Sequence, residues 1–241
     1  MPRIWEALER AEHEQTGQGE NAPIVTPERG TRDRSLREKL LAVYQGIESG
    51  LPDKDSRVVL FVGANPGEGT STLVRELAKL VSRELAKRVV LLDAEHGRGG
   101  HYEHFGVALE AGLEDVVSGQ RQLDEVLQPV NDNTMFLGCL ATNEPAASTV
   151  AASPRFKELI EQLHPEFDLV LLDAPPVRDS SNALLLTPAT DGVVLVVEAE
   201  KTRWQVADSL RQRMESQGGN ILGVILNKRK FYIPQVIYRR L

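Results

Sequence analysis

Residues Arg57 to Thr72 read RVVLFVGANPGEGTST. The first six are a short apolar run rich in β-branched side chains, which predicts a buried strand. The glycine-rich segment that follows leads into a helical pattern over Leu73 to Ala86. A strand, a glycine loop and a helix in this order form a cradle for an anion, because backbone N–H groups turn inward and the helix N-terminus adds partial positive charge.

The glycine loop matches the phosphate-loop pattern except at one position. Ala64 stands at the first small position, four residues follow, and Gly69 precedes Thr70 and Ser71. The pattern has a lysine where this chain has Thr70, so the cation that reaches the β and γ phosphates is missing, while Ser71 keeps a hydroxyl for Mg²⁺. Charge clamps on a transferring phosphoryl group are worth about 10²- to 10⁵-fold in rate. We therefore expect nucleotide binding to survive where turnover does not.

Acidic residues follow two further strand-like runs. Asp93 and Glu95 come after Arg88 to Leu92, and Asp173 comes after Leu169 to Leu172. In a doubly wound sheet the carboxyl ends of the strands converge on one crevice, where carboxylates can hold Mg²⁺ and position or deprotonate an attacking oxygen. A single aspartate at a strand end is usually a cap or a turn former. Three acids that face one phosphate loop instead favour a nucleotide site.

Helical patterns alternate with strand-like runs through the rest of the chain. Further strands are predicted over Met135 to Leu137, Gly192 to Val197 and Ile221 to Leu226, and a helix over Ser35 to Glu48. Strands that are apolar on both faces and are separated by helices indicate a mostly parallel sheet covered on both sides. Right-handed crossovers make this a doubly wound α/β domain of the P-loop NTPase kind. We expect it to span 34–241, after a short amphipathic helix at 1–15 and a flexible linker at 16–33.

Composition and charge exclude several classes of protein. The 241 residues carry a net charge of −7, which disfavours a free-standing nucleic-acid binder. The single cysteine, Cys139, cannot form an internal disulfide, and we expect it in the core. The apolar runs are far shorter than the roughly 20 residues that cross a bilayer. These features predict a cytoplasmic protein without a nucleic-acid partner.

Several separate motifs, in the right order, resemble a known family. They read PGEGTST at 66–72, LLDAE at 91–95, GLEDVVSG at 112–119, FDLVLLDAPPV at 167–177, TDGVVLVV at 190–197 and LGVILN at 222–227. Over about 35–241 the chain resembles the CpsD/CapB-type protein-tyrosine kinases of bacterial capsule and exopolysaccharide assembly, which are similar to the MinD/ParA ATPases. The resemblance implies ATP or ADP with Mg²⁺ as cofactor, self-association, a location at the inner face of the membrane, and a membrane polysaccharide co-polymerase or chain-length protein as partner.

The resemblance also implies a role for each matching residue. The nucleotide-binding Walker A loop would comprise Ala64, Asn65, Pro66, Gly67, Glu68, Gly69, Thr70, Ser71 and Thr72, and Asn227 would sit beside the adenine. Asp93, Glu95 and Asp173 would be the catalytic residues, with Asp173 as the Walker B aspartate and Asp93 as the general base for a tyrosine hydroxyl. Ser71, Asp93 and Asp173 would ligate the metal.

Four departures from the family pattern bear on activity. Thr70 replaces the lysine, Glu95 replaces the second aspartate, and the arginine-rich stretch after it survives only as Arg98 among glycines. The tyrosine-rich tail is reduced to Tyr232 and Tyr238. These departures favour a regulatory component with weak or lost catalysis.

Two other functions remain open on the sequence. The chain is alternatively an active ATPase or tyrosine kinase in which another cation, from Arg98, Arg178 or a neighbouring subunit, replaces the lysine. A partition-type ATPase is a third reading, which the acidic charge makes less attractive. His96, His101 and His104 follow the acidic pair, and we expect solvated loop histidines there rather than metal ligands.

Overall fold

The computed structural model describes residues 29–94, 100–130, 134–141 and 144–229. In this part of the chain one seven-stranded sheet has the order β3-β4-β2-β5-β1-β6-β7, and every neighbouring pair is parallel except β3 with β4. The strands are β1 (Arg57–Gly63), β2 (Val89–Asp93), β3 (Gln128–Val130), β4 (Met135–Cys139), β5 (Leu169–Asp173), β6 (Gly192–Glu198) and β7 (Ile221–Asn227). The predicted doubly wound, mostly parallel sheet is confirmed.

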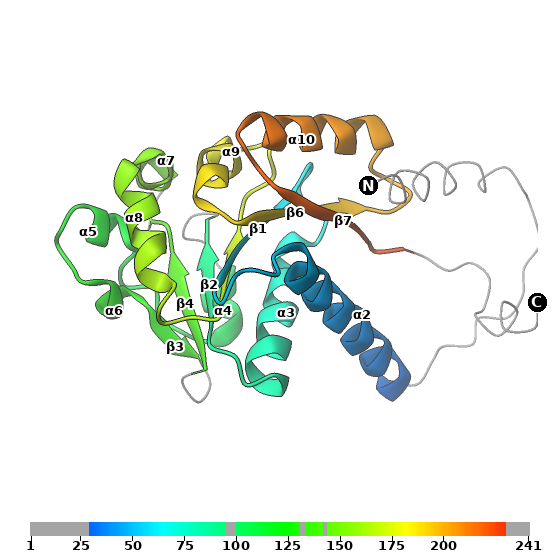
Figure 1. Cartoon of the computed structure of the whole chain (residues 1–241), viewed down its shortest axis with the longest axis horizontal. Helices are drawn as coiled ribbons and strands as arrows, with labels where there is room; N and C mark the ends of the chain where they lie inside the picture. The colour runs from blue at the N-terminus through cyan, green and yellow to red at the C-terminus, as the bar shows by residue number, and fades with distance from the viewer. Residues whose placement is uncertain (1–28, 95–99, 131–133, 142–143, 230–241) are drawn as a thin grey trace, which may run out of the picture.

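Helices cover both faces of this sheet (Figure 1). One face carries α2 (Arg29–Gly50), α3 (Thr70–Glu84) and α4 (His101–Phe105). The other face carries α5 (Leu113–Val117), α6 (Leu123–Val126), α7 (Glu144–Ala152), α8 (Pro154–Leu163), α9 (Asn182–Leu186) and α10 (Trp204–Ser216), with the short 3₁₀ helix η2 (Thr187–Ala189) after α9. None of the helices in the described ranges has the length and apolar character needed to span a bilayer.

The two layers of helices enclose two hydrophobic cores, one on each side of the sheet. Alternate residues of β1 belong to different cores: Leu60 packs into the core under α8 and α10, and Phe61 into the core under α2 and α3. Both side chains are fully buried. A central parallel strand therefore needs apolar side chains on both faces, which explains the uninterrupted apolar run in the sequence.

Helix α2 is longer than its apolar pattern predicts. It begins at Arg29, whereas the pattern predicts Ser35, so the linker prediction of 16–33 is wrong for its last five residues. The periodic signal starts only with the first apolar residue, and a polar first turn gives no such signal. Leu40 and Ile47 are buried against α3 and the core, as expected for a helix that packs on the domain. The predicted helix at 1–15 and most of the linker lie outside the described residues.

The strand ends place the candidate site at one edge of the sheet. Asp173 of β5 is in register with Phe61 of β1 on one side and with Asp93 of β2 on the other. The N–H group of Val177 donates to the carbonyl of Gly63, which holds the chain after β5 against the start of the phosphate loop. The loop after β1 and the two aspartates therefore share the carboxyl edge of the sheet.

Candidate functional site

The loop between β1 and α3 has the backbone of a phosphate loop. Gly67 and Gly69 have φ angles of 79° and 91°, a left-handed conformation that glycine adopts without steric cost. A Cβ atom on Gly69 would also lie only 2.4 Å from the side-chain nitrogen of Asn227. Both glycines are thus required by the local geometry, and α3 begins directly afterwards at Thr70.

Glu68 turns its carboxylate to the inner side of this loop, where the residue is only 2% exposed. Its Oε2 atom accepts hydrogen bonds from the N–H groups of Ala64, at 2.6 Å, and Asn65, at 3.0 Å. Its Oε1 atom accepts from the hydroxyl of Thr202, in the segment after β6, at 2.5 Å. A buried carboxylate is tolerated when several donors satisfy it. Glu68 therefore braces the loop from inside and ties it to the segment after β6.

The outer part of the loop keeps its hydrogen-bond donors. The N–H groups of Gly69, Thr70 and Ser71 donate to none of the described residues. They belong to the first turn of α3, where N–H groups have no partner inside the helix and the helix dipole is positive. The side chains of Thr70 and Ser71 are both partly exposed. This arrangement can accept an anion, with a hydroxyl where the phosphate-loop pattern has an ammonium group.

Asp93 and Asp173 lie side by side at the ends of β2 and β5, with exposed fractions of 8% and 2%. The Oδ1 atom of Asp173 is buried and accepts a hydrogen bond from none of the described residues. Two buried carboxylates at neighbouring positions repel each other unless a cation lies nearby. The chemistry of this pair therefore suits a divalent cation.

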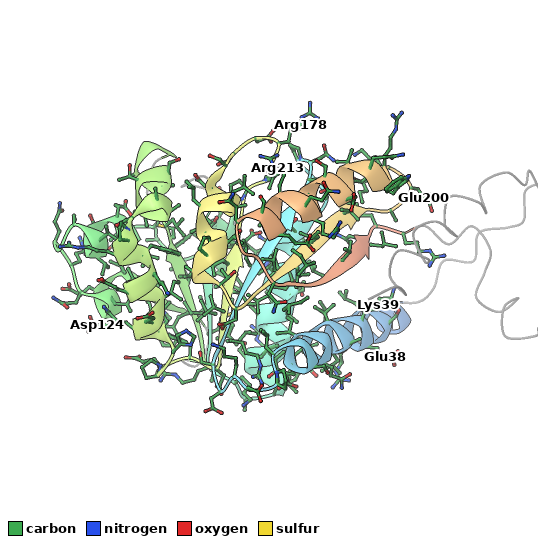
Figure 2. All side chains as sticks on the ribbon, turned by 45° about the horizontal axis from the view of Figure 1, so that its top comes forward. Glu38, Lys39, Asp124, Arg178, Glu200 and Arg213 are labelled. Carbon is green, nitrogen blue, oxygen red and sulfur yellow. The ribbon has the colours of Figure 1, made fainter. Side chains whose placement is uncertain are left out.

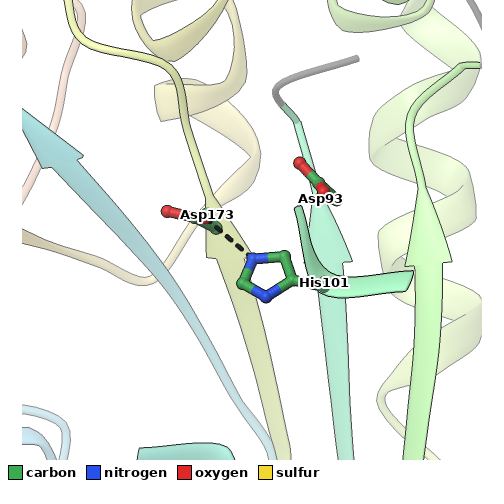
Figure 3. A group of neighbouring side chains, drawn as sticks. All are labelled: Asp93, His101 and Asp173. Atoms are coloured by element: carbon green, nitrogen blue, oxygen red, sulfur yellow. Dashed lines mark hydrogen bonds and ion pairs between the residues drawn. The ribbon is translucent and has the colours of Figure 1, made fainter. Parts of the chain in front are cut away.

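His101, the first residue of α4, completes this pair (Figure 3). Its Nε2 atom lies 2.8 Å from Oδ2 of Asp173, and the two side chains are 1% and 3% exposed. The expectation of a solvated loop histidine is therefore wrong for His101, because α4 folds back onto the strand ends and buries its first residues. His104 is exposed and contacts Lys79 at 2.8 Å. His96 lies outside the described residues.

Two side chains from β7 and its end lie against the other side of the loop. The Nδ2 group of Asn227 donates to the carbonyl of Glu68 at 2.9 Å. The ammonium group of Lys228 donates to the carbonyl of Gly67 and lies 3.4 Å from Oε2 of Glu198. The adenine contact of Asn227 remains a prediction. The role of Lys228 is missed by the sequence reasoning, whose only signal for it is a basic residue directly after Asn227.

Among the described residues, the predicted substitute cation Arg178 is not gathered at the site. Arg178 is exposed and its side chain points outward (Figure 2). Glu95 and Arg98 lie outside the described residues. The structure thus brings together the loop at 64–72, Asp93, Asp173 and Asn227, and adds His101, Thr202 and Lys228 to them.

Comparisons with known proteins agree with this architecture. No family model matches the chain. The chain is 26% identical over 201 residues to the tyrosine-protein kinase YwqD of Bacillus subtilis (strain 168), covering 83% of this chain and 84% of that protein. It is 25% identical over 207 residues to the tyrosine-protein kinase ptk of Acinetobacter johnsonii, covering 86% of this chain but 28% of that protein. The chain is homologous to bacterial tyrosine kinases.

Solved structures of kinases and ATPases share the fold. The kinase domain of the Escherichia coli tyrosine kinase ETK superposes with a TM-score of 0.76 at 23% identity, covering 92% of this chain and 86% of that domain. MinD from Pyrococcus horikoshii OT3, in complex with Mg-ADP, superposes with a TM-score of 0.62 at 20% identity, covering 77% and 76%. The resemblance to the CpsD/CapB-type kinases, and to the P-loop fold that they share with MinD, is confirmed.

Proposed function

We propose that this chain is a regulatory component of capsule or exopolysaccharide assembly that binds ATP or ADP with Mg²⁺ and turns it over slowly or not at all. The observation that carries the proposal is Thr70, a hydroxyl residue at the lysine position of the phosphate loop. The N–H groups of Ala64 and Asn65 already donate to Glu68, so the proposal uses only those at the start of α3. The homology to tyrosine kinases supports the nucleotide, and the resemblance to capsule and exopolysaccharide kinases supports the process.

Nucleotide binding rests on groups that do not depend on the missing lysine. The N–H groups at Gly69, Thr70 and Ser71 and the N-terminus of α3 would hold the phosphates. Ser71, Asp93 and Asp173 would hold Mg²⁺, and the Oδ1 atom of Asp173, which has no hydrogen-bond partner among the described residues, fits that role. The bound Mg²⁺ would neutralise phosphate charge and orient the nucleotide.

Weak turnover follows from the charge that the loop lacks. In the proposed kinase geometry Asp93 receives the proton of an attacking hydroxyl, but the loop itself has no lysine to stabilise the charge that develops on the transferred phosphoryl group. Such a clamp is worth about 10²- to 10⁵-fold in rate. Asp93 therefore remains as the proton acceptor, while the main electrostatic contribution to the rate of phosphoryl transfer is lost.

The partner and location are proposed from the family resemblance. We infer that the chain acts at the cytoplasmic face of the membrane by docking to a polysaccharide co-polymerase or chain-length protein. In this proposal 34–241 is the nucleotide-binding domain, preceded by a docking helix at 1–15 and a tether. Co-purification of the full chain with the membrane protein, and its loss on deletion of 1–15, would test the docking.

Product formation tests the weak-turnover proposal. Wild-type chain and an Asp93→Ala variant are incubated with ATP and Mg²⁺, and released phosphate and phosphotyrosine are measured. We expect little turnover in the wild type and little further loss in the variant. Rapid turnover that Asp93→Ala abolishes would contradict the proposal. An Asp124→Ala variant, at a solvent-exposed position of α6, serves as the matched control.

One observation favours the second candidate, an active kinase with a substitute cation. The ammonium group of Lys228 already contacts the carbonyl of Gly67 in the loop that lacks its own lysine. If this lysine replaces the missing cation, Lys228→Met abolishes turnover. Lys201→Met does not, although Lys201 is paired with the same Glu198 carboxylate as Lys228. Turnover that is absent in the wild type, or unchanged in Lys228→Met, excludes this candidate.

A further inference from the structure

Three buried side chains from three separate elements meet beside the phosphate loop. Asp93 ends β2, Asp173 ends β5 and His101 begins α4. One ligand atom from each lies within 4.8 Å of the others, and all three residues are buried (Figure 3). Burial removes both carboxylates from bulk water, which is costly unless a cation or hydrogen-bond donors compensate.

The polar groups of this cluster are only partly satisfied. Nε2 of His101 lies 2.8 Å from Oδ2 of Asp173, but the Oδ1 atom of Asp173 is buried and hydrogen-bonds to none of the described residues. That side chain is 3% exposed. A buried carboxylate oxygen without a donor is costly, and a cation beside it would remove the cost.

The backbone is shaped to bring the histidine to the acids. A Cβ atom on Gly100 would lie 3.0 Å from Oδ2 of Asp93, tighter than ordinary side-chain contacts. With a glycine at this position, the start of α4 can pack directly on the end of β2. The result is an imidazole held at the edge of a carboxylate pair.

We propose that Asp93, His101 and Asp173 bind a divalent transition-metal ion of the Mn²⁺, Co²⁺ or Zn²⁺ class in preference to Mg²⁺. Mg²⁺ takes oxygen ligands, whereas one imidazole nitrogen with two carboxylates suits first-row transition metals. Three protein ligands leave a further coordination position for water or a phosphate oxygen. The site shares two acids with the proposed nucleotide site but needs no nucleotide.

The ligand atoms must move closer together to bind one ion. Metal–ligand bonds of about 2.0 to 2.2 Å place tetrahedral ligands about 3.3 to 3.6 Å apart. The observed spread of up to 4.8 Å therefore requires side-chain movements of about 1 Å. The hydrogen bond between His101 and Asp173 is replaced on binding, because the imidazole nitrogen must offer its lone pair to the ion.

Metal titration of the full, chelator-treated chain without nucleotide tests the proposal. Co²⁺ binding is followed by its visible absorption, and Zn²⁺ and Mg²⁺ binding by calorimetry. We expect one Co²⁺ or Zn²⁺ site that binds more tightly than Mg²⁺. His101→Asn should weaken Co²⁺ and Zn²⁺ binding at least about tenfold, since even loss of a supporting partner of a metal ligand costs 10- to 100-fold. His104→Asn, an exposed histidine on the same helix, should leave both affinities unchanged.

Two results would overturn the proposal. In the first, the wild type and His101→Asn bind Co²⁺ with equal affinity. In the second, the wild type binds Co²⁺ no more tightly than Mg²⁺. Should His101→Asn fail to fold, pulsed electron paramagnetic resonance of Mn²⁺ on the wild-type chain decides instead. Coupling to one imidazole nitrogen supports the site, and its absence overturns it. None of these measurements uses nucleotide. The metal site can therefore be confirmed even if the chain does not bind nucleotide, and nucleotide binding can be confirmed even if the metal site is absent.

Discussion

At the scale of single residues, the phosphate loop has no lysine, but a buried glutamate inside it holds its backbone in place. Thr70 removes the ammonium group that the phosphate-loop pattern provides, yet Glu68 still holds Ala64 and Asn65 in place. The conformation of the loop therefore does not depend on the lysine. Because the loop keeps its shape without this charge, we expect the chain to bind nucleotide but to turn it over slowly or not at all.

The Glu68 brace predicts a measurable loss of stability. Glu68→Ala leaves the N–H groups of Ala64 and Asn65 and the hydroxyl of Thr202 without their acceptor. Unsatisfied buried donors cost about 1 to 3 kcal/mol, so urea unfolding should show a free energy of unfolding lower by about that amount. Glu110→Ala, at an exposed position, should change it by less than about 0.5 kcal/mol. Equal effects of the two substitutions would argue against the brace.

Cys139 should be unreactive in the folded chain. Burial, helped by the nearby charges of Glu114 and Asp93, raises the pKa of its thiol to about 12. The thiolate is the nucleophile, and the pKa of a free cysteine is about 8.5, so at pH 8.5 about half of the unfolded chains carry a thiolate. Iodoacetamide should therefore label the chain rapidly in urea and very slowly without it. Equal labelling rates in the two states would show that the thiol is accessible.

At the scale of elements, the longest helix and the shortest strand were the hardest to predict. The polar first turn of α2 has no apolar period, so its start at Arg29 could not be placed. Strand β3 has three residues, one of them Pro129, and pairs antiparallel at the sheet edge, where proline is tolerated. The inner parallel strands β2, β4, β5 and β6 were predictable because burial on both faces leaves a continuous apolar run. The edge strand β7 is only partly buried, but it also reads as an apolar run.

Helix α2 is part of the domain core, and a pair of substitutions checks this. Ile47 is 1% exposed and packs with residues of α3 and the sheet, whereas Leu36 on the same helix is 46% exposed. Ile47→Ala should lower the free energy of unfolding by about 2 to 5 kcal/mol. Leu36→Ala should lower it by no more than about 0.5 kcal/mol. If the Ile47→Ala chain were as stable as the wild type, the packing of α2 would not contribute to the stability of the domain.

At the scale of the whole molecule, the fold and the main site were predictable, whereas the contacts across the site were not. Parallel topology alone brings Asp93 and Asp173 together, because strand ends on one edge converge. The contacts of Thr202 with Glu68, Lys228 with Gly67 and His101 with Asp173 join positions far apart in the sequence. These contacts depend on the path of each loop and on the rotamer of each side chain. The hydrophobic periodicity of the sequence predicts neither.

The central claim is that the loop still binds a nucleotide although its lysine has become a threonine. Calorimetric titration of ATP·Mg²⁺ into the full chain tests it, with Thr70→Lys as the gain-of-charge variant and Gln120→Lys, at an exposed position outside the loop, as the matched control. A hydrogen bond to a charged group contributes about 1.5 to 3 kcal/mol, so Thr70→Lys should bind roughly 10- to 100-fold more tightly than the wild type. We predict saturable binding by the wild type and that gain only for Thr70→Lys. No binding by either the wild type or Thr70→Lys, or equal gains in both variants, would contradict the claim.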